Sequence, residues 1–252
     1  MQVSKSTLQE DLTYYTNLWK DDANVNNIVY QDFLNKTNSY DFLAKHVEVV
    51  HRYNLGYGEP AFRYLWLLLF NQIPNDGKFL EIGVFKGSIL ALSQLCAQKS
   101  DKVIECYGIT PLSPVGDKYS QYANDDYDYS IAFLYHQLGL NLDHTNIIQG
   151  LSTDSLVKKA ALANGPYDVV YIDGGHDYET VLNDIELSDS LLKPNGFLVL
   201  DDASSDLQFF TTHPGFPGHA DVARAVRDDL SKRTNYRHLF ACGHNRVWIK
   251  EN

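Results

Sequence analysis

The chain has 252 residues, 44% of them hydrophobic, and a formal net charge of −11 at neutral pH. This length fits one α/β domain with additions, and the acidic charge argues against nucleic acid or an anionic membrane as a partner, because both are bound through clustered Lys and Arg. The longest apolar run, Leu65 to Phe70, is too short to span a bilayer, and the N-terminus lacks the apolar core of a signal peptide. We therefore expect a cytoplasmic protein.

Residues 1–58 form the first predicted unit. They are polar, rich in Asn, Asp and Tyr, and show helical spacing without a strong apolar stripe. We expect an N-terminal helical extension that packs beside the main sheet or serves as a lid. A role in forming a homo-oligomer is also compatible with its Tyr and Trp content.

Residues 59–252, the second predicted unit, alternate between helical and strand-like segments. The apolar helical run that ends at Phe70 is stopped by Pro74-Asn75-Asp76-Gly77, and two short strands flank Gly243-His244-Asn245. This order predicts an α/β fold, a doubly wound, mostly parallel, seven-stranded Rossmann-like sheet with a C-terminal antiparallel hairpin. The predicted strands are 78–83, 103–109, 146–149, 167–172, 196–200, 236–241 and 246–250, and the clearest predicted helices are 61–70, 88–99, 130–138 and 221–233.

Two of these strands end in carboxylates. Asp173 follows the first of them, and Asp201 and Asp202 follow the second, 28 positions later. That spacing accommodates a crossover helix and a return strand, so we expect the two strand ends to be neighbours. Converging carboxylates are costly unless a proton or a cation neutralises them, and hard divalent ions prefer oxygen ligands. The sequence therefore predicts a metal site, although Asp202 could instead cap the next helix.

A glycine-containing turn follows the first strand of the sheet. It reads Glu81-Ile82-Gly83-Val84-Phe85-Lys86-Gly87 and precedes a helix that begins at Ser88. Glycine lets the backbone approach a ligand closely, and free N–H groups at a helix start face that ligand. Because the first βα turn is the usual cofactor contact of such sheets, we expect Glu81, Gly83, Gly87 and Ser88 to bind a cofactor. Alternatively, Glu81 is a buried carboxylate satisfied by backbone groups, and the glycines only form a tight turn.

Residues 78–250 resemble a class I S-adenosylmethionine-dependent methyltransferase, with E-I-G-V-F-K-G at 81–87 as its first motif. Within that superfamily, Y-I-D-G-G-H-D-Y-E at 171–179 and L-L-K-P-N-G-F-L-V-L-D-D at 191–202 are similar to the metal-dependent macrocin-type O-methyltransferases. Members of that family methylate sugar hydroxyls on glycosylated natural products. The resemblance implies S-adenosylmethionine and Mg²⁺ or Mn²⁺ as cofactors, and a small-molecule sugar or glycosylated compound as the partner.

The resemblance also implies roles for individual residues. The metal ligands of the family match Asp173, Asp201 and Asp202, and Asp173 also lies beside the cofactor. His176 stands where a general base is proposed, and its ordinary pKa suits that task. It could instead be a polar loop residue or a partner of Asp177.

Five further residues matter for binding. The second strand ends in Thr110, where these folds usually place an acidic residue that accepts both ribose hydroxyls; Asp117 in the following loop could substitute. Ser152 after the third strand is expected near the adenine, or it caps the next helix. His213 and His219 lie in a loop above the carboxylate edge and could contact substrate.

The first hypothesis is thus a Mg²⁺-dependent sugar O-methyltransferase in which His176 and Asp173 are catalytic. A hydroxylase on the same fold would use iron with His176 as a ligand. A non-catalytic adenosyl-binding module would fit the uncharged Thr110 position. The fold is common to all three.

Overall fold

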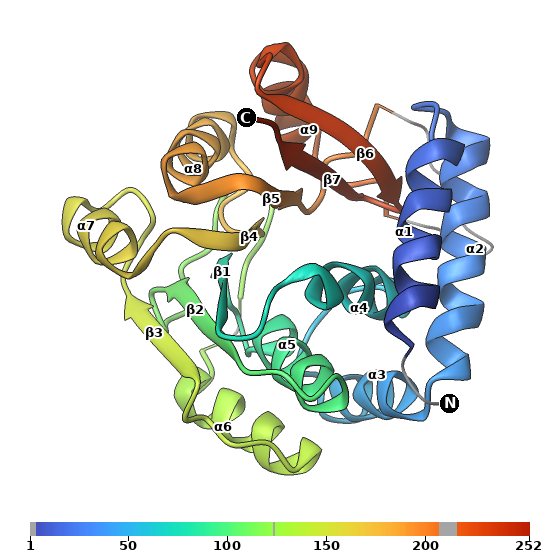
Figure 1. Cartoon of the computed structure of the whole chain (residues 1–252). Helices are drawn as coiled ribbons and strands as arrows, with labels where there is room; N and C mark the ends of the chain where they lie inside the picture. The colour runs from blue at the N-terminus through green and yellow to red at the C-terminus, as the bar shows by residue number, and fades with distance from the viewer. Residues whose placement is uncertain (1–3, 123, 207–215) are drawn as a thin grey trace.

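The computed structural model describes residues 4–122, 124–206 and 216–252 of the chain. Its centre is one sheet of β1 (Gly77–Ile82), β2 (Ile104–Thr110), β3 (Thr145–Gln149), β4 (Tyr167–Ile172), β5 (Leu192–Leu200), β6 (Tyr236–Cys242) and β7 (Asn245–Lys250). The strands lie in the order β3-β2-β1-β4-β5-β7-β6 (Figure 1). β1 to β5 are parallel, and β7 is antiparallel to both β5 and β6. The predicted fold class is confirmed.

Helices cover both faces of the sheet (Figure 1). One layer holds α4, α5 and α6, and the other holds α7, α8 and α9, with the short 3-10 helix Leu230–Lys232 after α9. The helices of the described residues are α1 (Lys5–Leu18), α2 (Ala23–Ser39), α3 (Asp41–Tyr53), α4 (Phe62–Gln72), α5 (Ser88–Lys99), α6 (Tyr127–Leu138), α7 (Ser155–Asn164), α8 (Tyr178–Leu191) and α9 (Ala220–Asp228).

The central strands are buried on both faces. In β4, Val169 and Tyr171 pack into the core on the α4 side, while Val170 and Ile172 pack into the core on the α8 side. This alternation follows from the two-residue repeat of a strand. A parallel strand between two helical layers therefore reads as a continuous apolar run, which is why these strands could be predicted from the sequence.

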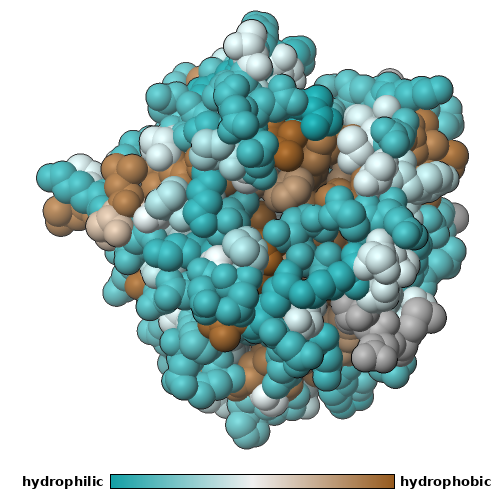
Figure 2. Space-filling view, viewed as in Figure 1, coloured by the Kyte–Doolittle hydropathy of each residue, from teal (hydrophilic) through white to brown (hydrophobic). Residues whose placement is uncertain are grey.

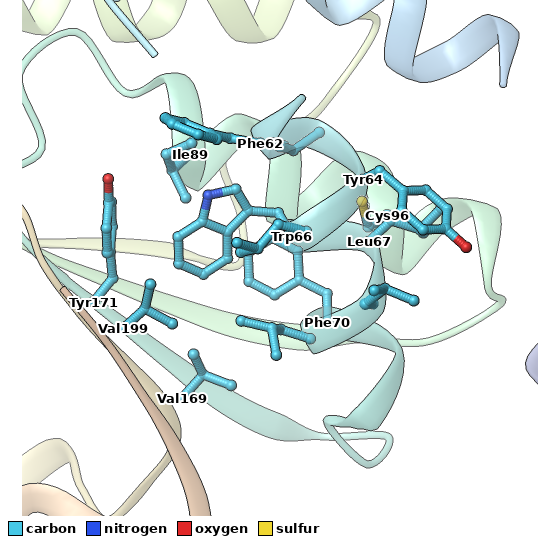
Figure 3. Close-up of a cluster of buried hydrophobic side chains, with 14 of the residues drawn as sticks. Phe62, Tyr64, Trp66, Leu67, Phe70, Ile89, Cys96, Val169, Tyr171 and Val199 are labelled. Carbon is cyan, nitrogen blue, oxygen red and sulfur yellow. The ribbon is translucent and has the colours of Figure 1, made fainter. Parts of the chain in front are cut away.

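The core on the α4 side holds the side chain of Tyr171, which reaches the carboxyl edge of the sheet. Trp66 of α4 is fully buried, stacks on Phe70 with ring centroids 5.1 Å apart, and meets the Tyr171 ring edge-on at 4.7 Å (Figure 3). The Tyr171 hydroxyl donates a hydrogen bond of 3.1 Å to Asp173 Oδ2, directly after β4. Packing in the core thus sets the position of one carboxyl group at the carboxyl edge of the sheet.

The N-terminal extension is helical, as predicted, and shares a hydrophobic core with the sheet. α1 and α2 contact α4 and β6, and α3 contacts α6. The buried Asn26 side chain of α2 bonds both the N–H and the C=O of Gly243 at 2.8 and 2.9 Å. The extension therefore holds the turn between β6 and β7 in place.

The surface seen in Figure 2 is mostly hydrophilic, with apolar residues gathered over α7. On that helix, Leu156 and Leu162 are 76% and 50% exposed. These are side chains that a second chain could cover, and the predicted homo-oligomer stays a prediction.

Among the described residues, no helix combines the length and the apolar character that a membrane-spanning segment needs.

Candidate functional site

The carboxyl ends of β4 and β5 lie side by side. Ile172 pairs with Leu200 in the sheet, and the Asp201 N–H donates to the Ile172 carbonyl at 3.0 Å. Asp173 and Asp201 are therefore neighbours, as the strand spacing predicted. Their carboxyl groups contact each other, and burial first, then the charges of Asp201 and Asp202, raise the pKa of Asp173 well above its usual range.

Imidazole rings lie close to both carboxylate oxygens of Asp202. His176 Nε2 and His219 Nε2 lie 3.3 and 3.4 Å from Oδ2, and His244 Nδ1 lies 3.0 Å from Oδ1. Burial alone would raise the pKa of Asp202, but His176 and His244 hold it well below the usual range. Among the described residues after Asp202, the first helix is α9, which begins at Ala220 with His219 as its N-cap. The alternative that Asp202 caps that helix is therefore wrong.

A close backbone contact brings His219 to this cluster. Gly218 has φ +98°, and a Cβ there would lie 2.1 Å from the Asp202 carbonyl oxygen. The following N–H, of His219, donates to that same oxygen at 2.9 Å. Glycine is thus needed for the loop to return over Asp202.

His176 is held by the loop after β2 and not by its neighbour Asp177. Its backbone N–H and its Nδ1 both donate to Asp117 Oδ2, at 2.7 and 2.8 Å. Because a carboxylate only accepts, Nδ1 carries the proton and Nε2 faces the cluster. Burial would lower the pKa of His176, but Asp202 and then Asp117 outweigh it and raise that pKa.

Two cavities open at the carboxyl edge of the sheet. The first, the cofactor cleft, encloses about 970 Å³ including its mouth and runs along the ends of β1, β2, β3 and β4. The second, the carboxylate chamber, encloses about 1530 Å³ and contains Asp201, Asp202 and the three histidines. Five of the described residues line both cavities: Gly83, Val84, Phe85, Tyr122 and Asp173. A ligand in the cleft would therefore face a second ligand in the chamber across these shared residues.

The predicted cofactor residues divide between the two cavities. Gly83, Thr110, Ser152 and Asp173 line the cofactor cleft. Glu81 and Ser88 line the carboxylate chamber instead. Gly87 is in the lining of neither cavity; its φ is +81°, and a Cβ there would meet Ile131 at 3.0 Å.

Glu81 is a buried carboxyl group with one unsatisfied oxygen. Oε2 has no hydrogen-bond partner among the described residues. Burial raises the pKa of Glu81 well above its usual range; the Leu90 backbone N–H opposes this shift, and Asp201 adds to it. Backbone contact therefore satisfies the group only in part, so Glu81 is available to a ligand in the chamber.

Ser152 does not cap a helix. α7 has Asp154 at its N-cap position, and the Ser152 hydroxyl bonds the buried Asp184 of α8. Burial raises the pKa of Asp184 to about 6, against the opposing effect of Ser152. Ser152 thus links the cofactor cleft to α8.

Asp117 cannot replace an acidic ribose ligand. Oδ1 accepts the N–H groups of Tyr119 and Ser120, both at 2.8 Å, and Oδ2 accepts both donors of His176. These four bonds use the four acceptor sites of a carboxylate. The idea that Asp117 binds the ribose is therefore corrected, and Asp117 orients His176 instead.

The role left for Thr110 at the cofactor is small and testable. Its hydroxyl already accepts the Leu112 N–H at 3.2 Å, which leaves one acceptor site and one donor for a ribose. We expect Thr110→Val to weaken binding of S-adenosylhomocysteine by only about 2- to 10-fold, the value of one ordinary hydrogen bond. Calorimetric titration measures this change. A loss beyond 100-fold would show that Thr110 carries the ribose contact that an acid makes elsewhere.

Sequence reasoning missed three features of this site. His244 was seen only as part of a hairpin turn, Asp117 was placed at the ribose, and His219 was one of two loop histidines without an assigned partner. His213 lies outside the described residues. The signal that could have found His244 is its position: a hairpin after the last parallel strand returns to the carboxyl edge of its neighbour.

The donor atoms of this site suit a divalent cation. The described residues contain two groups of ligand atoms that all lie within 4.8 Å of one another: Asp201, Asp202 and His244, and His176, Asp202 and His219. Asp173 contacts Asp201 at the edge of the first group. Carboxylates pressed together in this way, one with a raised pKa, are the arrangement that a cation relieves.

Comparisons with known proteins give a family match and a relative for part of the chain. Residues 80–203 match the family described as "Methyltransferase domain". A curated relative is the uncharacterized protein R132 of Acanthamoeba polyphaga mimivirus, 31% identical over 130 residues, which is 51% of this chain and 52% of that protein. The match thus spans about half the length of the relative.

Solved structures share the fold. An O-methyltransferase from Bacillus cereus in complex with SAH (S-adenosylhomocysteine) is 14% identical, with a TM-score of 0.54 over 84% of this chain and 91% of that chain. The MycE methyltransferase of the mycinamycin pathway, in complex with Mg, SAH and mycinamycin VI, is 18% identical, with a TM-score of 0.51 over 82% of this chain and 55% of that chain. Residues 80–203 are therefore similar to a methyltransferase domain, and the chain shares its fold with solved O-methyltransferases.

Proposed function

We propose that this protein transfers a methyl group from S-adenosylmethionine to a hydroxyl of a sugar or glycosylated compound, with the help of a divalent cation. The observation that carries the proposal is the junction of the two cavities, whose shared lining includes Gly83 and Asp173. Methyl transfer needs the donor and the acceptor in line and in contact. A cofactor cleft that opens onto a carboxylate chamber provides such an arrangement.

The cofactor fits the first cavity by position. The cleft follows the ends of β1 to β4, where open α/β sheets bind nucleotide cofactors. Ser152 would lie by the adenine, Thr110 by the ribose, and the turn at Gly83 by the methionine part. The Bacillus cereus O-methyltransferase of the same fold was solved with SAH, which supports this placement.

The cation fits the carboxylates of the chamber. Asp173, Asp201 and Asp202 would hold Mg²⁺ or Mn²⁺, and MycE, which has the same fold, was solved with Mg. A bound divalent cation supplies Lewis acidity that lowers the pKa of an acceptor hydroxyl. Removal of the hydroxyl proton is assigned to a side chain of the protein itself.

His176 is the proposed proton acceptor. Asp117 holds the proton on Nδ1 and leaves Nε2 toward the chamber. The acceptor oxygen forms a bond to the methyl carbon, the S–CH₃ bond breaks with its electron pair passing to sulfur, and the hydroxyl proton moves to Nε2. The Asp202 carboxylate, 3.3 Å from Nε2, stabilises the imidazolium that results.

The lining of the chamber favours a neutral acceptor. It includes several aromatic rings, among them those of Tyr57, Phe62 and Phe216, and the described lining residues include no Lys or Arg. Aromatic faces suit the apolar faces of sugar rings, and an excess of carboxylates repels a phosphate. A glycosylated compound or glycan therefore fits better than a nucleotide-linked sugar.

One observation favours a second candidate, the metal-dependent hydroxylase. His176 Nε2, His219 Nε2 and Asp202 Oδ2 lie within 4.8 Å of one another, and two histidines with one carboxylate are the ligand set of many non-haem iron oxygenases. Oxygen consumption that depends on Fe²⁺, without methyl transfer, would favour this candidate.

Calorimetric titration of metal-stripped protein with S-adenosylhomocysteine, with and without Mg²⁺, tests the proposal. We expect micromolar binding in both conditions, followed by cation-dependent methylation of a neutral glycoside in an acceptor screen. Absence of binding in both conditions would contradict the cofactor assignment and favour the candidates that do not methylate.

A further inference from the structure

His244 lies in the turn of the C-terminal hairpin, close to the carboxylates of the chamber. It lies between β6 and β7, and its carbonyl accepts the N–H of Ala203 at 2.9 Å. The neighbouring Asn245 side chain donates to Asp201 Oδ1 at 2.7 Å, and Asn26 of α2 fixes Gly243 from the other side. The position of the ring is therefore determined by three separate elements of the fold.

The ring itself is buried and wedged between aromatic side chains. Only 6% of His244 is exposed, and it lines the carboxylate chamber. Phe62 and Phe216 meet the ring edge-on, with centroids 4.7 and 5.7 Å away. A side chain held in this way cannot rotate away to find another partner.

Nδ1 of His244 lies within ion-pair distance of two carboxylates, without a well-directed hydrogen bond to either. It lies 2.8 Å from Asp201 Oδ1 and 3.0 Å from Asp202 Oδ1, yet it is a buried nitrogen without a hydrogen-bond partner among the described residues. The oxygens are near but off the axis along which an N–H would donate. One nitrogen and two oxygens that converge on the same point of the chamber are placed as ligands are placed around an ion.

We propose that His244 Nδ1 is a metal ligand together with Asp201 Oδ1 and Asp202 Oδ1, and that the site prefers a first-row transition metal ion such as Mn²⁺ over Mg²⁺. The inference rests on the proposed function, because it concerns the cation of the same chamber. Imidazole nitrogen binds transition metal ions well, whereas Mg²⁺ favours carboxylate, carbonyl and water oxygens. His176 keeps its separate place on the other oxygen of Asp202.

The test is the binding of Mn²⁺ to the metal-stripped full chain. We expect calorimetry to give a dissociation constant for Mn²⁺ at least about 10-fold below that for Mg²⁺. Pulsed electron paramagnetic resonance of the bound Mn²⁺ should show modulation from a directly bonded ¹⁴N nucleus. Neither readout requires activity or a known acceptor.

Variants show which histidine supplies the nitrogen that binds Mn²⁺. His244→Ala should abolish the ¹⁴N modulation and weaken Mn²⁺ binding by more than the roughly 10- to 100-fold that loss of an outer partner costs, while Mg²⁺ binding changes less. His219→Ala, near the other oxygen of Asp202, should keep the modulation, and so should His136→Ala, at an exposed position of α6. If His244→Ala does not fold, His244→Gln keeps much of the volume and supplies no imidazole.

The outcomes separate this inference from the proposed function. Three outcomes would overturn the ligand role of His244. Mn²⁺ could bind without ¹⁴N modulation, the modulation could persist in the His244→Ala or His244→Gln variant, or Mn²⁺ could fail to bind at all. In each of these cases, binding of S-adenosylhomocysteine and methyl transfer can still be measured on the same protein, and their loss would count against the proposed function alone.

Discussion

Asp201→Asn is expected to remove cation-dependent methyl transfer almost completely, by about 100-fold or more, and to leave binding of S-adenosylhomocysteine within about threefold of wild type. The carboxylate lies in the chamber, between Asp173 on one side and His244 on the other. It does not line the cofactor cleft. Replacing it removes a ligand charge where the cation would bind and leaves the cofactor contacts in place.

The folded state should tolerate this change. Asparagine has nearly the same shape and can still meet the Asn245 amide that now donates to Oδ1 at 2.7 Å. Loss of the charge removes repulsion toward Asp173 but also removes attraction to His244, whose pKa Asp201 and Asp202 raise to about 10 against the effect of burial. Because the two effects oppose each other, we expect the melting temperature to change by only a few degrees.

A matched control separates a local effect from a general one. Asp228→Asn removes the same charge at the exposed end of α9 and should change neither turnover nor cofactor binding. The measurements are initial rates with and without added Mg²⁺ or Mn²⁺, calorimetry with S-adenosylhomocysteine, and thermal melting. Full cation-dependent turnover by Asp201→Asn would rule out Asp201 as a ligand.

The part of the site that could be predicted from sequence lies on regular structure. Asp173, Asp201 and Asp202 follow apolar runs that can only be buried parallel strands, and the crossover between the runs forces their ends together. Element boundaries were less accurate where side chains decide them. α6 begins at Tyr127, earlier than the predicted 130, because the Asp126 side chain caps it by accepting the Tyr129 N–H at 2.9 Å.

The part that could not be predicted is brought in by loops and turns. Asp117 meets His176 across 59 positions of sequence, and His244 meets Asp201 across 43. No periodicity of either segment encodes these contacts, because they depend on how the loop after β2 and the terminal hairpin fold back over the sheet. The contacts between these histidines and aspartates can therefore be predicted only when the strand order is known.

The second large effect is expected at Gly83, where the two cavities meet. Its φ is +98°, and a Cβ there would lie 1.9 Å from the Asp173 carbonyl oxygen and 2.4 Å from its carbonyl carbon. Hydrogen bonds lock the surrounding backbone, since the Gly83 N–H donates to Ile109 and the Asp173 N–H donates to Ile82, at 2.9 and 2.8 Å. No flexible side chain is available to give way.

Gly83→Ala should therefore push the end of β1 away from the end of β4. The left-handed backbone costs about 1 kcal/mol for alanine, and crowding typically adds about 1–3 kcal/mol. At about 2–4 °C per kcal/mol for a domain of this size, we expect a fall in melting temperature of roughly 4–16 °C. S-adenosylhomocysteine binding should be lost even at temperatures where the variant is folded, because Gly83 lines the cofactor cleft.

Gly139→Ala supplies the control for this experiment. Gly139 ends α6 with φ +67°, and a Cβ there has nothing within 4 Å. It therefore carries the left-handed backbone cost without the collision, so we expect a fall of only about 2–4 °C and unchanged cofactor affinity. Thermal melting and calorimetry of the two variants then separate backbone strain from close packing. Equal effects of the two substitutions would mean that the β1 and β4 ends can move apart, and that Gly83 serves only the turn.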